Sequence, residues 1–175
     1  TAVLGSRSRD TMATLGPEPP RAGDVLAIGR EPPASLIGDV VPLRRRIDDA
    51  VRISFGPRDD WFTAESRRAL IDQEWVIGGE RSRIGVRLGG RPLERVSTHR
   101  ERELPSEGLV AGAIQVPPNG QPVVMLADHP TTGGYPVVAV IDPADLGEFA
   151  QRPSGEAVRF TTADSVRPGA GPLQG

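Results

Sequence analysis

Apolar and polar side chains alternate along six short segments of the chain, and glycine and proline residues interrupt this pattern. A period of two places alternate side chains on opposite faces of a strand, so this pattern predicts half-buried β-strands. The segments are VRISFG (51–56), RIGVRL (83–88), LVAGAIQV (109–116), PVVMLAD (122–128), YPVVAVID (135–142) and AVRFTT (157–162). The pattern therefore indicates a mainly β protein.

Helical patterns are few and short. Thr63 is a candidate N-cap for a helix that continues AESRRALIDQE, with Leu70 and Ile71 on its buried side. A second helix is predicted with Asp142 as N-cap and Pro143 at its first position. The expected fold class is thus mainly β with a few short helices.

The connections between the strands carry turn signals. PPNGQP (117–122) contains Asn-Gly, a strong turn signal, so 109–116 and 122–128 are predicted to pair as a hairpin. The next connection, ADHPTTGGYP (127–136), joins two strongly apolar segments but is too long for a two-residue turn. We consider two interpretations of this second connection.

The first interpretation is an ordinary glycine-containing hairpin loop, with Tyr135 buried at the start of the next strand. The second is a ligand-binding loop. Backbone amides at Gly133 and Gly134 can approach a ligand without a Cβ in the way, and the hydroxyls of Thr131 and Thr132 both donate and accept. Such a loop can cradle an anion or an amide.

Two arginines flank a glycine in the segment 83–88. Alternation places Arg83, Gly85 and Arg87 on the face opposite the apolar side chains. Two guanidinium groups beside a missing side chain form a shallow cationic recess that suits a carboxylate or a phosphate. The alternative is a solvated strand face whose arginines pair with acidic residues of the chain.

Other polar or aromatic residues have competing structural roles. Asp128 ends an apolar strand, where it could orient an arginine, or act as a base if its pKa were raised. Gln115 is polar on an apolar strand and Glu107 precedes that strand. They could bind a ligand, or Gln115 could satisfy a buried backbone group and Glu107 could cap a turn.

Trp61 and Trp75, which bracket the first helix, are expected as core anchors. His99, in a polar run, is expected to be a solvated loop residue.

Composition excludes several classes of function. The net charge of -2 and the pI near 5.7 argue against a nucleic-acid surface. Every basic residue is arginine, so the chain cannot form a Schiff base or the lysine-containing phosphate loop of common NTPases. Without cysteine there is no thiol nucleophile and no zinc-thiolate site. No long apolar run or signal-peptide pattern is present, so we expect a cytoplasmic protein without membrane contact.

Two segments of the chain resemble each other, and this internal similarity bears on the domain organisation. PRAGDVLAIG (20–29) and RPSGEAVRFTT (152–162) share an arginine, then a glycine followed by an acidic residue, then alternating apolar positions. Chance and true duplication both account for it. If the duplication is real, residues 1–45 are the tail of a first, largely absent domain plus a linker. Residues 46–175 then form the second domain.

Several long motifs, in order, resemble the KipA family, also called allophanate hydrolase subunit two or the C subunit of 5-oxoprolinase, within the biotin-dependent carboxyltransferase superfamily. These motifs are LGSRSRDT (4–11), GPRDDWFT (56–63), SRIGVRL (82–88), ELPSEG (103–108) and GAIQVPPNGQPVVMLADHPTTGGYPVVAVI (112–141). The chain resembles the C-terminal half of family members. The resemblance implies a cyclophilin-like β-barrel, duplicated in the full-length protein, but no isomerase activity.

The resemblance also implies partners and chemistry. It implies a subunit of an ATP-dependent 5-oxoprolinase, which opens 5-oxoproline to L-glutamate together with a KipI-like B subunit and an A subunit of the LamB/YcsF type. ATP is then a co-substrate, and no metal is expected beyond its Mg²⁺. One alternative is an allophanate hydrolase or urea carboxylase-type carboxyltransferase subunit. Another is a non-enzymatic regulator that binds a KipI-like protein and antagonises a kinase inhibitor.

With the resemblance, the polar residues above become candidate site residues that provide electrostatic help, because no residue looks like a nucleophile. Asp128 and Arg87 are the catalytic candidates. The candidates for binding the substrate or an anion are Arg83, Glu107, Gln115, Thr131, Thr132, Gly133, Gly134 and Tyr135.

Overall fold

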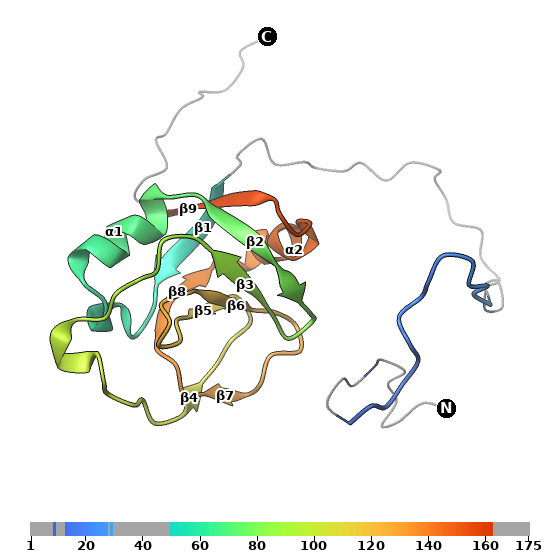
Figure 1. The fold of residues 1–175 in the computed structure, drawn as a ribbon, viewed down its shortest axis with the longest axis horizontal. Coiled ribbons are helices and arrows are strands. Elements are labelled where there is room, and N and C mark those ends of the chain that lie inside the picture. Colours follow the sequence, from blue (N-terminus) through green and yellow to red (C-terminus); the bar gives the residue numbers. More distant parts are fainter. Residues whose placement is uncertain (1–8, 10–12, 28, 30–49, 163–175) are drawn as a thin grey trace, which may run out of the picture. The chain divides into compact units, whose positions relative to one another are not determined.

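The fold is known from a computed structural model that describes residues 9, 13–27, 29 and 50–162 (Figure 1). Contacts divide the chain into two compact units, Thr1–Arg44 and Arg45–Gly175, which are considered separately. The motif at 4–11 falls, except for Arg9, outside the described residues.

The second unit is a closed β-barrel with short helices. Its strands are β1 (Ala50–Phe55), β2 (Trp75–Arg81), β3 (Gly85–Gly89), β5 (Ala113–Gln115), β6 (Val123–Met125), β8 (Val137–Ile141) and β9 (Ala157–Thr162), in the order β1-β8-β5-β6-β3-β2-β9. The parallel pair β1–β9 closes the barrel, and the other pairs are antiparallel. The expectation of a mainly β barrel with a few short helices is confirmed.

Both predicted helices form with the expected caps. Helix α1 (Ala64–Asp72) follows Thr63, whose Oγ1 accepts a hydrogen bond from the Ser66 amide at 3.1 Å. Helix α2 (Pro143–Gln151) follows Asp142, whose carboxylate accepts from the Ala144 amide at 2.9 Å. Two 3-10 turns, η1 (Asp59–Trp61) and η2 (Ser97–His99), complete the helical elements of the described residues.

Alternation along the strands divides the apolar side chains between two clusters. The inner cluster fills the barrel and includes Trp75, Ile114 and Val138, all fully buried, while Leu70 of α1 joins it from outside the sheet. The outer cluster consists of Leu109, Ala113, Met125 and Val137. Both tryptophans are buried, as expected for core anchors. Leu109 of the outer cluster lies against Gly133, where a Cβ would be only 2.8 Å from its Cδ1.

Three sequence expectations need correction. The alternation pattern does not reveal strand β2, because WVIGGER has two glycines and a polar end. The segment 83–88 begins as a turn, in which the Ser82 amide donates to the Gly85 carbonyl at 3.1 Å, so Ile84 is 40% exposed. The interpretation of 127–136 as a hairpin loop is wrong, because β5 lies between β6 and β8. By contrast, the predicted pairing of β5 with β6 is confirmed.

In the N-terminal unit, the first of the two similar segments forms a turn. Gly23 has φ 95°, and the Asp24 amide donates to the Arg21 carbonyl at 3.0 Å. The second copy has the same geometry: Gly155 has φ 88°, and the Glu156 amide donates to the Pro153 carbonyl at 3.2 Å. Both turns place a glycine where a left-handed backbone is required. That residues 1–45 belong to a first domain stays a prediction.

Candidate functional site

The connection from β6 to β8 forms a small second sheet outside the barrel. Strand β7 (Thr132–Gly133) pairs antiparallel with β4 (Glu107–Gly108), so that Glu107 lies opposite Gly133 and Gly108 opposite Thr132. The Leu109 amide extends the pairing by donating to the Thr131 carbonyl at 2.9 Å. Figure 1 shows this ribbon below the barrel strands. We call residues Thr131–Tyr135 the corner loop.

Gln115 fixes the corner loop to the barrel. Its side chain, on β5, is buried, and its amide nitrogen donates to the Tyr135 carbonyl at 2.8 Å. A Cβ on Gly133 would lie 2.7 Å from this same nitrogen and 2.8 Å from Cδ1 of Leu109. Only glycine therefore lets the loop approach Gln115 this closely. Of the roles considered for Gln115, the structure shows the one of satisfying a buried backbone group.

An ion pair holds the other side of the ribbon. Arg58, just before η1, donates from Nε to both carboxylate oxygens of Glu107 at 3.1 Å, and its Nη2 also contacts that carboxylate. The Arg58 amide donates to the Val137 carbonyl at 3.2 Å, which anchors the arginine on β8. The hydrogen bond from Arg58 lowers the pKa of Glu107, although burial acts in the opposite direction. Sequence reasoning missed Arg58, although it lies within the motif GPRDDWFT.

Asp128 is paired with Arg83. Nε and Nη2 of Arg83 donate to the two carboxylate oxygens at 2.7 and 3.0 Å, while the Asp128 amide donates to the Arg83 carbonyl at 2.8 Å. The side-chain hydrogen bond from Arg83 lowers the pKa of Asp128. Of the two roles considered for Asp128, the structure shows the one of orienting an arginine, and the lowered pKa makes this carboxylate a weaker base.

Arg87 projects from the outer face of β3. In the register of the sheet Arg87 lies opposite Val123, and Val123 lies opposite Gln115. Residues directly opposite each other share a face, so Arg87 and Gln115 are on the same side, two strand spacings or about 10 Å apart. The Arg87 side chain is 57% exposed, and its Nε lies 3.4 Å from Glu80. Its guanidinium therefore remains accessible to a ligand.

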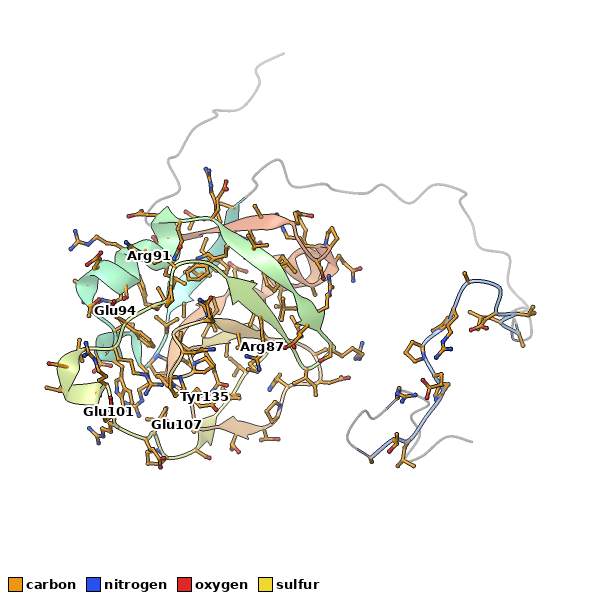
Figure 2. All side chains as sticks on the ribbon, in the orientation of Figure 1. Arg87, Arg91, Glu94, Glu101, Glu107 and Tyr135 are labelled. Atoms are coloured by element: carbon orange, nitrogen blue, oxygen red, sulfur yellow. The ribbon has the colours of Figure 1, made fainter. Side chains whose placement is uncertain are left out.

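The candidate residues thus form three groups. Glu107, Gln115 and the corner loop lie together, with Thr131, Thr132, Gly134 and Tyr135 exposed. Arg87 shares the outer face with Gln115. Arg83 and Asp128 form a separate ion pair beyond the start of β3. Figure 2 shows Tyr135 and Glu107 where the ribbon meets the barrel.

A second polar cluster surrounds Trp61, whose side chain is buried. The guanidinium carbons of Arg95 and Arg102 lie 5.9 and 5.7 Å from its ring centroid, which is within the range of cation–π contact. The His99 ring packs edge-on at 4.4 Å between centroids. His99 is half-buried, so its expected role as a solvated loop residue is wrong: Trp61 provides an aromatic surface for it.

A surface depression of about 670 Å³ lies beside α1, away from these residues. It is lined by Glu65, Arg68, Ala69, Asp72, Gln73 and Arg91, none of which is a candidate. In the described part of the chain, no group of His, Asp or Glu side chains is placed to hold a metal ion. The helices of that same part are too short or too polar to cross a bilayer.

The closed barrel with its outer ribbon defines a carboxyltransferase-type domain, as comparison with known proteins shows. Residues 1–162 match the family described as "Carboxyltransferase domain, subdomain A and B". The chain belongs to this family.

Two curated relatives are C subunits of 5-oxoprolinase. The chain is 37% identical over 161 residues to the C subunit of 5-oxoprolinase from Escherichia coli K12, covering 90% of this chain and 51% of that protein. It is 32% identical over 161 residues to the corresponding Haemophilus influenzae protein, with 90% and 50% covered. The chain therefore spans about half the length of these relatives. Urea amidolyase of Lachancea kluyveri is 27% identical over 187 residues, which make up 90% of this chain and 10% of that protein.

Solved structures agree on the fold. The protein TTHA0988 superposes with a TM-score of 0.67 at 35% identity, covering 90% of this chain and 30% of its own. The Kluyveromyces lactis urea amidolyase superposes with a TM-score of 0.60 at 23% identity, covering 65% of this chain and 7% of its own. This last likeness concerns the fold alone.

Proposed function

We propose that this chain is part of the C subunit of an ATP-dependent 5-oxoprolinase, which opens the lactam of 5-oxoproline to L-glutamate. The identity of 37% over 161 residues with the Escherichia coli protein carries this proposal. The outer face of the barrel is compatible with it. Arg87 offers an accessible guanidinium for the substrate carboxylate, and the threonines of the corner loop offer hydroxyls for the lactam amide.

The chemistry we assign to this chain is electrostatic. Opening a lactam requires activation of a stabilised amide, and ATP provides the driving force as co-substrate with its Mg²⁺. The chain has neither lysine nor cysteine, so a phosphate loop of the usual kind and a thiol nucleophile are absent from it. We assign to Arg87 the binding of charge on the substrate or on a phosphorylated intermediate. Arg83, held by Asp128, adds a second positive group at the edge of the face.

The partners follow from this function. A KipI-like B subunit and an A subunit of the LamB/YcsF type would complete the enzyme, in the cytoplasm. We place the exposed corner loop at the substrate, and Gln115, Gly133 and the Arg58–Glu107 pair beneath it as residues that position the loop.

The test is reconstitution of the full-length subunit with its B and A partners, followed by measurement of ADP release. Release that depends on 5-oxoproline supports the proposal. Release that depends instead on urea supports the urea amidolyase-type alternative, which the 27% identity over 187 residues favours as second candidate. If no amide stimulates release while the B subunit still binds tightly, the enzymatic proposal is contradicted in favour of the regulator.

Arg87→Ala and Thr132→Ala then test the site within the complex. Arg87→Ala removes a charge-assisted hydrogen bond of about 1.5–3 kcal/mol and should lower kcat/KM about 10- to 100-fold, whereas Thr132→Ala removes a neutral one of about 0.5–1.5 kcal/mol and should lower it about 2- to 10-fold. Arg159→Ala is the matched control, because Arg159 is 63% exposed and pairs with Glu74 on another part of the barrel. Unchanged turnover in both site variants would remove Arg87 and Thr132 from the mechanism.

A further inference from the structure

Arg95 carries a positive charge that no carboxylate of the described residues pairs with. Its Nη1 donates to the Arg102 carbonyl at 3.3 Å and its Nη2 to the Val116 carbonyl at 3.2 Å. Its Nε is buried and has no hydrogen-bond partner within the described part of the chain. The two carbonyls satisfy some donors, but they leave the net charge of the guanidinium uncompensated.

The surroundings of Arg95 make this charge more costly. Burial lowers the pKa of Arg95, and the phenol of Tyr135 is the group that opposes this shift. Arg102 lies against the same Trp61 ring, so two guanidinium groups share one aromatic side chain. A partly desolvated cation beside a like charge is unfavourable unless an anion compensates it.

The cation also adjoins the corner loop. Val116, whose carbonyl Arg95 binds, follows Gln115, whose side chain holds the Tyr135 carbonyl. The Val116 amide donates to the Pro136 carbonyl at 3.0 Å, so Gln115 and Val116 bind the carbonyls of Tyr135 and Pro136 next to Arg95. Tyr135 itself is 46% exposed.

We propose that Arg95, Arg102 and the phenol of Tyr135 form a binding site for a small oxyanion, either a carboxylate or a phosphoryl group. Guanidinium groups bind both through paired N–H donors, and the phenol adds a neutral donor. The identity of the ligand rests on the proposed function: with Arg87 holding one anionic group of the reaction, this site holds the other, either the carboxylate of 5-oxoproline or the phosphoryl group derived from ATP. The site itself requires only the geometry around Trp61.

The experiment follows the Arg95 Nε–H resonance by NMR in the full-length subunit. Acetate, inorganic phosphate and 5-oxoproline are titrated separately at constant ionic strength, without ATP or partner subunits. Arg95→Lys identifies the resonance by its disappearance. We expect a saturable shift, because an anion at this guanidinium changes the environment of a donor that has no other partner among the described residues.

Two variants and a control show which groups bind. Arg102→Gln should weaken binding about tenfold and Tyr135→Phe about threefold, as expected for the loss of a charged and of a neutral donor. Both side chains are exposed, so neither variant depends on refolding the core. Arg91→Gln is the control, because Arg91 is 62% exposed and pairs with Glu65 beside α1. It should leave the affinity unchanged.

The outcomes separate the sources of the anion. A shift with acetate and 5-oxoproline identifies a carboxylate site, and a shift with phosphate alone identifies a phosphoryl site; both support the inference. No saturable shift with any of the three, or affinities that Arg102→Gln and Tyr135→Phe leave intact, would overturn it. Because no turnover is measured, a failed 5-oxoprolinase assay contradicts the proposed function and leaves this binding result standing.

Discussion

The side-chain amide of Gln115 donates a 2.8 Å hydrogen bond to the backbone carbonyl of Tyr135. This bond joins the buried β5 to the exposed corner loop, so the position of the loop depends on one side chain of the barrel.

Gln115→Met keeps the volume of the side chain but leaves the Tyr135 carbonyl without its partner. Loss of a partly buried hydrogen bond costs about 0.5–1.5 kcal/mol, so we expect the free energy of unfolding to fall by that amount in urea titrations. Gln151→Met, on the exposed end of α2, is the control and should change it by less than about 0.5 kcal/mol. Equal stability of the two variants would show that this bond does not hold the loop.

Gly133→Ala tests the close approach of β7 to the barrel. The new methyl group would meet the Gln115 amide nitrogen and Leu109 at 2.7 and 2.8 Å, so the ribbon must move. We expect a loss of about 1–3 kcal/mol in stability, as for other overpacked sites, together with a larger fractional loss of ADP release. Gly108→Ala, on the partner strand, is the control because its Cβ has no neighbour within 4 Å. A Gly133→Ala variant of full activity would contradict the assignment of the corner loop to the site.

The Arg58–Glu107 ion pair predicts how stability depends on pH. Arg58 lowers the pKa of Glu107 below its ordinary value of 4.5, so the folded protein binds fewer protons than the unfolded chain in this range. The contribution of the pair is therefore complete above pH 4.5 and is lost as the pH falls through the folded-state pKa. Glu107→Gln should lower the unfolding free energy at neutral pH, and its difference from the wild type should shrink on acidification.

Thermal melts between neutral and acidic pH measure this difference. Glu101→Gln, an exposed change on the neighbouring loop, serves as the comparison. If the difference in unfolding free energy between the wild type and Glu107→Gln does not change with pH, Glu107 stabilises the fold through packing and not through its charge.

Asp145 holds α2 against β1. Its carboxylate accepts hydrogen bonds from the amide, Nε and Nη2 of Arg52 at 2.9, 3.0 and 2.7 Å, and its side chain is only 4% exposed. Asp145→Ala removes these three hydrogen bonds to a buried carboxylate, which should destabilise the fold by about 2–4 kcal/mol. Asp72→Ala, at the exposed end of α1, should have little effect. Chemical denaturation of both variants distinguishes a structural ion pair from a neutral surface contact.

Arg83 and Asp128 should behave as one unit. In a double-mutant cycle with Arg83→Gln and Asp128→Asn, the double variant should lose no more activity than the Arg83 variant, because Asp128 acts through the arginine it orients. An additional loss in the double variant would show that Asp128 has a role of its own as a base.

The sequence predicts local features of this fold well and long-range ones poorly. Strand β9 has the predicted bounds, and both helices begin at the predicted caps, Thr63 and Asp142, because these signals lie within a few neighbouring residues. Alternation does not say which strands pair, so it does not predict the insertion of β5 between β6 and β8. Candidate site residues can be named from the motifs, but the Arg58–Glu107 contact spans 49 positions and leaves no local pattern.

The parallel pairing of β1 with β9 has a consequence for biosynthesis (Figure 1). These strands are the first and last of the barrel, so the cylinder cannot seal until position 162 has left the ribosome. Until then, β1 and β2 each present an unpaired edge to other nascent chains. A translation pause before Ala157 would therefore prolong the exposure of these edges on the ribosome, and a premature stop there would release an open, aggregation-prone sheet.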